Sequence, residues 1–311
     1  MSTYILRKGV AKLSDLADGQ GAYGYPGDYP GRVYYVNNIT GASGNDGLSW
    51  KTPFAQISQA ITAAEAYRQL PSLATNEYIR NIIYVQGTGT AYTALTALPN
   101  YCDIIGIGAE SRGNGAGIVI IGANGADGIA GSARGLGMYN LQFVSGGAFW
   151  CADFVNLFRS RIENCAFQGT TAASDGGMRF TGAAGGLFIK NCHWKGSGDV
   201  INKVGIQAQG THFNESVIED CVIGGTTAGV LIDSTVKNGD QTVFRHNFIG
   251  DTGLGGCVTA IDDNQPADLV GYMQYIDNAV MGTNLITIAN SGAARCHGNY
   301  SANSFVAVTA S

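Results

Sequence analysis

Charge is scarce in this chain of 311 residues. Asp, Glu, Lys and Arg together make up 13% of it, against about 25% in an average soluble domain. The formal net charge is −5 and Lys and Arg form no cluster, so we expect no nucleic-acid partner. No apolar run is long enough to cross a membrane, and we expect no membrane partner either.

The chain also lacks the spacings that bind metals or mark secretion. Its seven cysteines include no CxxC pair, the tight cluster that a metal site normally needs. The start, MSTYILRKGVAKL, has no apolar core or cleavage site of a secretory signal. We therefore expect synthesis in a reducing bacterial cytoplasm and mostly free thiols. No Pro-, Ser- or charge-rich linker divides the chain, which favours one large domain.

What the sequence does contain is a repeat. Seven segments fit a six-position template whose third position holds residue types that tolerate a left-handed backbone. These are Asn140, Asn164, Asn191, Asp220, His246, Asp277 and Gly298. Mostly apolar side chains hold the first position, from Met138 to Cys296, and the sixth, from Phe143 to Ser301. A bend that recurs once per coil between inward apolar residues is typical of a β solenoid.

Two other columns of the template carry polar side chains. The second position holds Glu163, Lys190, Glu219 and Arg245 in succession, which we interpret as a ladder of surface ion pairs between neighbouring strands. The alternative is that Glu163 and Glu219 form a catalytic carboxylate pair. The fourth position holds Cys165, Cys192 and Cys221 and then Asn247, Asn278 and Asn299. We interpret it as a stack of small inward-facing side chains.

The N-terminal third is organised differently. Residues 1–32 end in GQGAYGYPGDYPGR, which is too rich in turn residues for regular structure and too aromatic for a typical linker, so we predict a docking arm. Thr52 and Pro53 then predict the cap and first residue of a helix over about residues 53–68. One apolar face of this helix would cover the open end of the first coil.

Residues 34–64, YYVNNITGASGNDGLSWKTPFAQISQAITAA, carry a resemblance together with the later units IENCAF, IKNCHW and IEDCVI. They resemble the opening segment and the strand-bend-strand corners of the pectin-lyase-like right-handed parallel β-helix superfamily. The resemblance implies an all-β parallel β-helix over residues 33–311, with an N-terminal capping α-helix and an extended N-terminal arm. This architecture serves polysaccharide lyases, glycosidases, phage tailspikes and virion decoration proteins alike.

An enzyme of this class needs acidic residues. Lyases that resemble this fold bind Ca²⁺ with acids and remove a proton with a basic residue, and glycosidases use two carboxylic acids. The best candidates are Asp262 and Asp263, with Asp251 and Asp268 nearby, but we interpret their segment TAIDDNQPADLVG as a turn between corners. The Gly-His-Gly and Asn-Thr-Asp motifs of polygalacturonase-like relatives are absent. We therefore predict no catalytic residue and no cofactor, with Ca²⁺ implied only for a lyase.

The sequence favours a structural protein on the surface of a bacteriophage virion, either a head-surface decoration protein or a short spike. We expect a homotrimer that contacts other virion proteins through the arm and the host through a cell-surface glycan. The small and apolar residues 304–311, SFVAVTAS, follow the last coil without a polar cap, so a neighbouring chain would be a natural cover. Two alternatives stay open: a polysaccharide lyase or glycoside hydrolase, and a glycan-binding module without catalysis.

Overall fold

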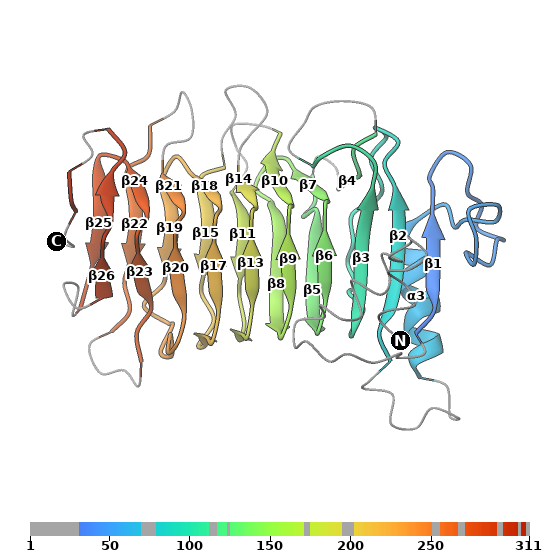
Figure 1. Cartoon of the computed structure of the whole chain (residues 1–311), viewed down its shortest axis with the longest axis horizontal. Helices are drawn as coiled ribbons and strands as arrows, with labels where there is room; N and C mark the ends of the chain where they lie inside the picture. The colour runs from blue at the N-terminus through green and yellow to red at the C-terminus, as the bar shows by residue number, and fades with distance from the viewer. Residues whose placement is uncertain are drawn as a thin grey trace, which may run out of the picture.

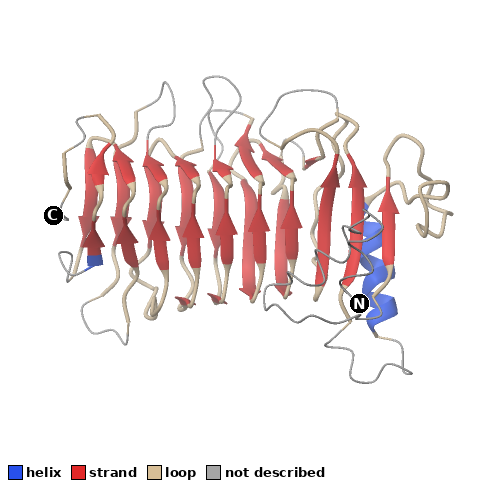
Figure 2. Cartoon of the chain, viewed as in Figure 1, coloured by secondary structure: helices blue, strands red, loops and turns tan. Residues whose placement is uncertain are grey.

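The computed structural model describes residues 31–69, 79–111, 117–122, 125–170, 175–194, 202–250, 256–266, 271–290, 295–303 and 306–308. Within these ranges the chain forms three parallel sheets that run side by side along one axis, with the strands stacked coil upon coil (Figure 1). Helix α3 lies at the N-terminal end of the stack (Figure 2). The predicted right-handed parallel β-helix with an N-terminal capping helix is confirmed.

Sheet A has ten strands: β1 Val33–Val36, β2 Asn81–Gln86, β3 Cys102–Ile107, β6 Gly137–Tyr139, β9 Arg161–Glu163, β13 Phe188–Lys190, β17 Val217–Glu219, β20 Val243–Arg245, β23 Gln274–Ile276 and β26 Cys296–His297. Sheet B has eight: β4 Ile120–Ile121, β7 Gln142–Ser145, β10 Ala166–Gly169, β14 His193–Trp194, β18 Val222–Gly224, β21 Phe248–Gly250, β24 Ala279–Met281 and β27 Tyr300–Ser301.

Sheet C closes each coil. Its strands are β5 Ile129–Arg134, β8 Trp150–Phe158, β11 Gly176–Phe180, β12 Ala184–Gly185, β15 Val204–Ala208, β16 Phe213–Asn214, β19 Ala228–Ile232, β22 Thr259–Asp263 and β25 Asn284–Ile288. From β6 onward the chain passes from sheet A through a tight bend to sheet B, then through a longer connection to sheet C and back. The variable connections explain why the repeats are unequal in length.

The bend between sheets A and B follows the predicted column. All seven residues of that column have positive φ, from 52° at Asn164 to 65° at Gly298. Asn and Asp adopt this conformation at low cost and Gly at almost none. A second left-handed column, which the sequence analysis missed, lies between sheets C and A. It consists of Tyr101, Gly135, Arg159, Gly186, Glu215 and Gln241.

The interior is one continuous apolar core in which like side chains stack along the axis. Phe143, Phe167 and Trp194 stack with ring centroids 5.3 and 4.9 Å apart. A second aromatic stack passes through Phe154, Phe180, Phe213, Phe244 and Tyr275. Because each coil buries its apolar face only against its neighbours, the fold depends on this stacking.

The capping helix begins later than predicted. Helix α3 spans Ile57–Arg68, and the backbone N–H of Gln56 donates to the Gln59 side chain at 2.9 Å. Thr52 instead donates to Asp46 at 2.6 Å within a turn. Phe54 pairs with Val36 as an extra parallel bridge on the edge of β1. The helix still buries Ile57, Ala60, Ile61 and Ala64, so its role as a cover holds.

The predictions for the two ends of the chain have different outcomes. The predicted arm lies outside the described residues except for positions 31 and 32. At the C-terminal end, Ala307 forms an antiparallel bridge with Tyr300, and the Val308 N–H donates to the Asn299 carbonyl at 2.8 Å. Val308 packs against the core, although Val306 is 62% exposed. The expectation of an uncovered last coil was therefore wrong for this corner, because the chain folds back on its own edge.

Candidate functional site

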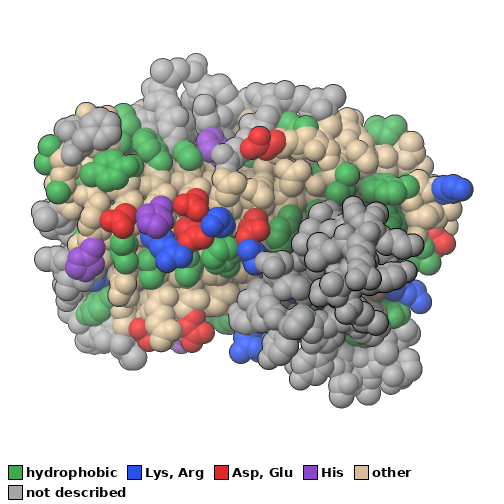
Figure 3. Space-filling model, viewed as in Figure 1, with side chains coloured by type: hydrophobic (Ala, Val, Ile, Leu, Met, Phe, Trp, Pro, Cys, Tyr) green, Lys and Arg blue, Asp and Glu red, His purple; other side chains and the backbone are tan. Residues whose placement is uncertain are grey.

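The charged row on the outer face of sheet A has the predicted register. Glu163, Lys190, Glu219 and Arg245 are direct neighbours on consecutive strands. Glu219 accepts hydrogen bonds from Lys190 Nζ at 2.8 Å and from Arg245 Nη2 at 2.6 Å. Figure 3 shows acidic, basic and histidine side chains gathered in a row across the face in view.

Glu219 is not the exposed surface charge that the sequence suggested. Its side chain is 9% exposed, whereas those of Lys190 and Arg245 are 41% and 45% exposed. Burial raises the pKa of the Glu219 carboxyl, but the hydrogen bonds and charges of Lys190 and Arg245 outweigh it and hold the pKa below its usual range. Glu163 pairs with Arg161 of its own strand at 2.5 Å. Both glutamates are thus engaged by cations.

Asp262 and Asp263 lie in strand β22, Thr259–Asp263, so the interpretation of their segment as a turn was wrong for these two residues. They are adjacent residues of one strand, and their side chains therefore point to opposite faces of sheet C. Asp263 points inward and is fully buried, whereas Asp262 is partly exposed on the outer face. This geometry separates the two carboxylates. The nearby Asp251 and Asp268 lie outside the described residues.

Asp263 anchors a buried polar cluster near the last coil. It pairs with Arg295, accepts a hydrogen bond from the Tyr275 hydroxyl at 2.8 Å and accepts another from the Gln265 backbone N–H at 3.0 Å. Arg295 also donates to the Met273 carbonyl at 2.9 Å. Burial raises the pKa of Asp263 despite the charge of Arg295. A carboxyl sealed in this way holds coils together and has no access to a substrate.

The outer face of sheet C carries a second charged group. Asp153 and Arg179 are register neighbours and pair at 2.6 Å. The Arg179 guanidinium lies 5.0 Å from the centroid of the Trp150 ring, which leaves Trp150 only 4% exposed. Asp262 occupies the same outward row four strands further on. At about 4.8 Å per strand the two acids are about 19 Å apart, too far for a glycosidase pair at about 5–9.5 Å.

A further buried ion pair, at the N-terminal end of sheet A, was missed by the sequence analysis. Arg80 pairs with Asp103 through two nitrogens, and its Nη1 donates to the Gly135 carbonyl at 2.9 Å. Asp103 is fully buried, and burial raises its pKa while Arg80 opposes the rise. Asp103 sits in the apolar run CDIIGI of β3, where only a lone acid among apolar residues could have signalled a partner.

Other candidate chemistry is dispersed. Of the four histidines, His246 occupies the left-handed bend as predicted, with Nε2 3.8 Å from Asp277. Cys165, Cys192 and Cys221 are buried free thiols. Within the described ranges no group of three or more His, Cys, Asp or Glu side chains could hold a metal ion. No helix among the described residues is both long and apolar enough to cross a membrane.

Comparison with solved structures identifies the architecture. The crystal structure of pectate lyase Pel9A superposes with a TM-score of 0.54 at 14% identity, covering 84% of this chain and 66% of that one. The chain has the pectin-lyase-like parallel β-helix fold. Two structures of the GH136 lacto-N-biosidase from Eubacterium ramulus, one native and one a selenomethionine derivative, match with TM-scores of 0.29 and 0.31 at 10% and 11% identity. Each covers 86% of this chain and 62% of its own.

The sequence itself finds no relative in the other two comparisons. No protein-family model matches the chain, and no curated protein matches it. The chain spans about two thirds of the length of Pel9A. At 14% identity the likeness establishes the fold alone, so the activity of the chain has to be argued from its own residues.

Proposed function

We propose that this β-helix is a structural subunit on the surface of a bacteriophage virion, as a head-surface decoration protein or a short spike. The observation that carries the proposal is that many of the charged residues form ion pairs between neighbouring coils. Ion pairs join neighbouring coils at Arg80–Asp103, Asp153–Arg179, Asp175–Lys203, Lys190–Glu219, Glu219–Arg245 and Asp263–Arg295. These ion pairs stabilise the stacking of the coils, which is the property that a structural subunit needs.

The pKa values of the carboxyls support the same reading. A general acid at neutral pH needs a raised pKa and contact with substrate. Asp103 and Asp263 have raised pKa values but are fully buried. The pKa of the Glu219 carboxyl lies below its usual value, because Lys190 and Arg245 pair with the carboxylate. None of these three acids meets both requirements.

Exposed apolar side chains at the two ends of the stack favour self-association or attachment. Leu48 and Trp50 are 47% and 43% exposed near the N-terminal cap, and Tyr300 and Val306 are 38% and 62% exposed near the last coil. Burial of such residues against a partner is favourable. We propose a trimer that is held on the particle by residues 1–32, with a host cell-surface glycan as a further contact.

The proposal is tested on the purified chain and on particles of a phage whose genome encodes the chain. Sedimentation should give three times the chain mass of 32.4 kDa, and antibody against the chain should label intact particles. A variant lacking residues 1–32 should keep the β-helix circular dichroism and fail to bind particles. Unlabelled particles, or full binding by the truncated chain, would contradict the proposal.

A second candidate is a glycan-active protein, either a lyase, a glycoside hydrolase or a non-catalytic module. One observation favours it: Asp262 is an outward carboxylate on sheet C for which the described residues provide no ion pair. A monomer that cleaves an acidic polysaccharide with Ca²⁺, and loses this activity in Asp262→Asn, would establish the lyase. Binding without cleavage would indicate the module.

A further inference from the structure

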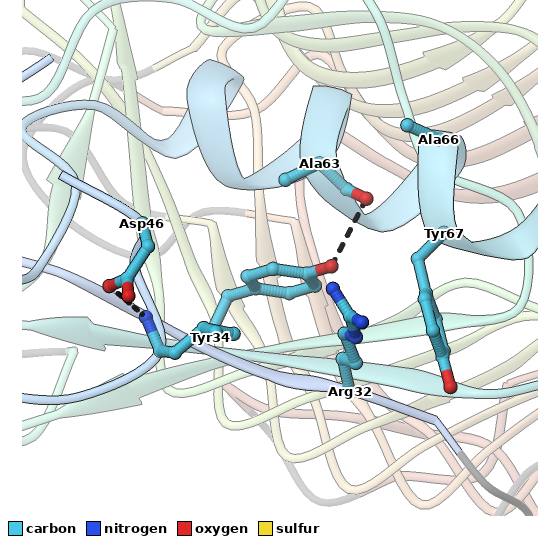
Figure 4. Close-up of a pocket in the computed structure, with 7 residues that line it drawn as sticks. Arg32, Tyr34, Asp46, Ala63, Ala66 and Tyr67 are labelled. Atoms are coloured by element: carbon cyan, nitrogen blue, oxygen red, sulfur yellow. Dashed lines mark hydrogen bonds between the residues drawn. The ribbon is translucent and has the colours of Figure 1, made fainter. Parts of the chain in front are cut away.

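A pocket of about 330 Å³ opens at the N-terminal cap, between the start of strand β1 and helix α3. Tyr34 lies in it, and its hydroxyl donates to the Ala63 carbonyl at 3.1 Å (Figure 4). Ala63 and Ala66 line one side from helix α3, and the side chain of Leu48 lines another. Two alanines one turn apart leave the space that larger side chains would fill.

The pocket contains a cation, Arg32, for which the described part of the chain provides no acidic partner. The Arg32 guanidinium lies 4.2 Å from the centroid of the Tyr67 ring. The backbone N–H of Arg32 donates to the Asn81 side chain at 2.9 Å, which fixes the main chain at this residue. None of the ion pairs among the described residues includes Arg32. The guanidinium also makes a side-chain hydrogen bond with the Tyr34 hydroxyl. Stacking on the Tyr67 ring fixes the guanidinium plane, and the remaining N–H groups of the five can bind an anion.

Among the described residues that line the pocket, the acid Asp46 is already engaged. Asp46 Oδ1 accepts hydrogen bonds from the Thr52 hydroxyl at 2.6 Å and from the Leu48 backbone N–H at 3.1 Å. These bonds lower the pKa of Asp46 and keep it ionised. A ligand with a second negative charge would therefore be repelled from this wall.

We propose that this pocket binds a small monocarboxylate with an apolar body. The carboxylate would pair with the fork of N–H groups on Arg32, which matches the geometry of two carboxylate oxygens. The apolar body would lie against Ala66 and Leu48, whose side chains are exposed to water, above the buried Tyr34 ring that closes the base of the pocket. Mostly apolar walls with few convergent polar groups are typical of small-molecule sites.

The probe is 3-phenylpropanoate, titrated into the full-length protein by calorimetry. A ligand of this size in an open pocket should bind with a Kd on the order of 1 mM. The neutral analogue 3-phenylpropanamide should not bind measurably. Phenylsuccinate, which has a second carboxylate, should bind more weakly, and equal affinity would overturn the preference for a single charge.

Two variants locate the site. Arg32→Gln should weaken binding at least about tenfold, and Ala66→Leu, at an exposed helix position, should abolish it by filling the pocket. Matched controls are Lys51→Gln, which removes an exposed cation outside the pocket, and Thr62→Leu, which enlarges another exposed helix residue. Both should bind like the parent. Absence of saturable binding to the parent, or parent-like binding by Ala66→Leu, would overturn the proposal even if Arg32→Gln failed to fold.

Discussion

The most informative substitution is Glu219→Lys, because it reverses one charge at the centre of the row on sheet A. The Glu219 carboxylate accepts one hydrogen bond from Lys190 and two from Arg245, at 2.8, 2.8 and 2.6 Å. The substitution removes all three and places cations on three consecutive strands. Like charges directly opposite one another destabilise a strand pair.

The expected loss follows from burial. Exposed ion pairs contribute about 0.2–1 kcal/mol each, whereas removal of one partner from a fully buried pair costs about 3–5 kcal/mol. Glu219 is almost buried at 9% exposure, but both of its partners reach water. The lost pairs and the added repulsion together should lower the free energy of unfolding by about 2 kcal/mol. The sequence alone, which places this residue on the surface, predicts about 0.5–1 kcal/mol.

Equilibrium urea unfolding followed by circular dichroism measures this difference. Glu163→Lys is the matched control, because the described ion pair of Glu163 is with Arg161 in the same strand, and it should cost less than Glu219→Lys. Equal losses in the two variants would show that the contacts across coils add nothing. A loss below about 0.5 kcal/mol for Glu219→Lys would show that Glu219 contributes no more to stability than an exposed charge does.

The same residue predicts a pH dependence with a defined sign. The pKa of Glu219 in the folded chain is below its ordinary value of 4.5, so the unfolded chain binds the proton more tightly. The stabilisation is therefore fully present above about pH 4.5 and is lost as the pH falls through the lower folded pKa. The stability difference between the parent and Glu219→Gln should shrink over that acidic range. A difference independent of pH would refute the assignment.

Three further predictions concern the interior, each measured by urea or thermal unfolding. Asn278→Ala should cost about 3 kcal/mol, because the buried Asn247 N–H and Phe244 carbonyl of the preceding coil lose their partner, and a loss near zero would exclude a stabilising role for the Asn278 amide. Arg295→Met should cost about 3–5 kcal/mol by leaving Asp263 buried and unpaired, and the added change Asp263→Asn should recover part of it. Cys192→Asn should be tolerated, whereas Cys192→Val should be less stable.

The left-handed bends were predictable because their chemistry is narrow. Asn140, Asp220 and Gly298 belong to the few residue types that adopt positive φ at low cost, so recurrence at one position gave the corner and its register. The second column holds Gly135 and Gly186, but its other four residues, Tyr101, Arg159, Glu215 and Gln241, belong to types with no such preference. Its conformation is imposed by the stacking of coils, and stacking leaves no mark at a single position.

The start of helix α3 and the strand β22 were harder to predict, because contacts with other strands decide both. Thr52 and Pro53 form a good helix start, but Phe54 pairs with the edge of β1 and delays the helix to Ile57. Asp262 and Asp263 sit among turn-forming residues, yet neighbours on both sides draw them into strand β22. In each case hydrogen bonds to residues distant in sequence override a local preference.

The contacts of the fourth column explain why asparagine can follow cysteine in one stack. In each coil the bend leaves a backbone N–H and a backbone carbonyl directed at the next coil. Asn278 satisfies both, accepting from the Asn247 N–H at 3.0 Å and donating to the Phe244 carbonyl at 2.9 Å. Cys221 makes the first contact less strongly, accepting from the Cys192 N–H at 3.4 Å. Its thiol, which has a single hydrogen, lies closer to the Glu219 carbonyl of its own coil, at 3.1 Å, than to the Ile189 carbonyl of the preceding coil, at 3.9 Å. A thiol and an amide are alike in offering a donor and an acceptor on a short side chain. The position therefore selects for that pair of functions and for small size, and the cysteines need no redox or metal role to account for their place in the fold.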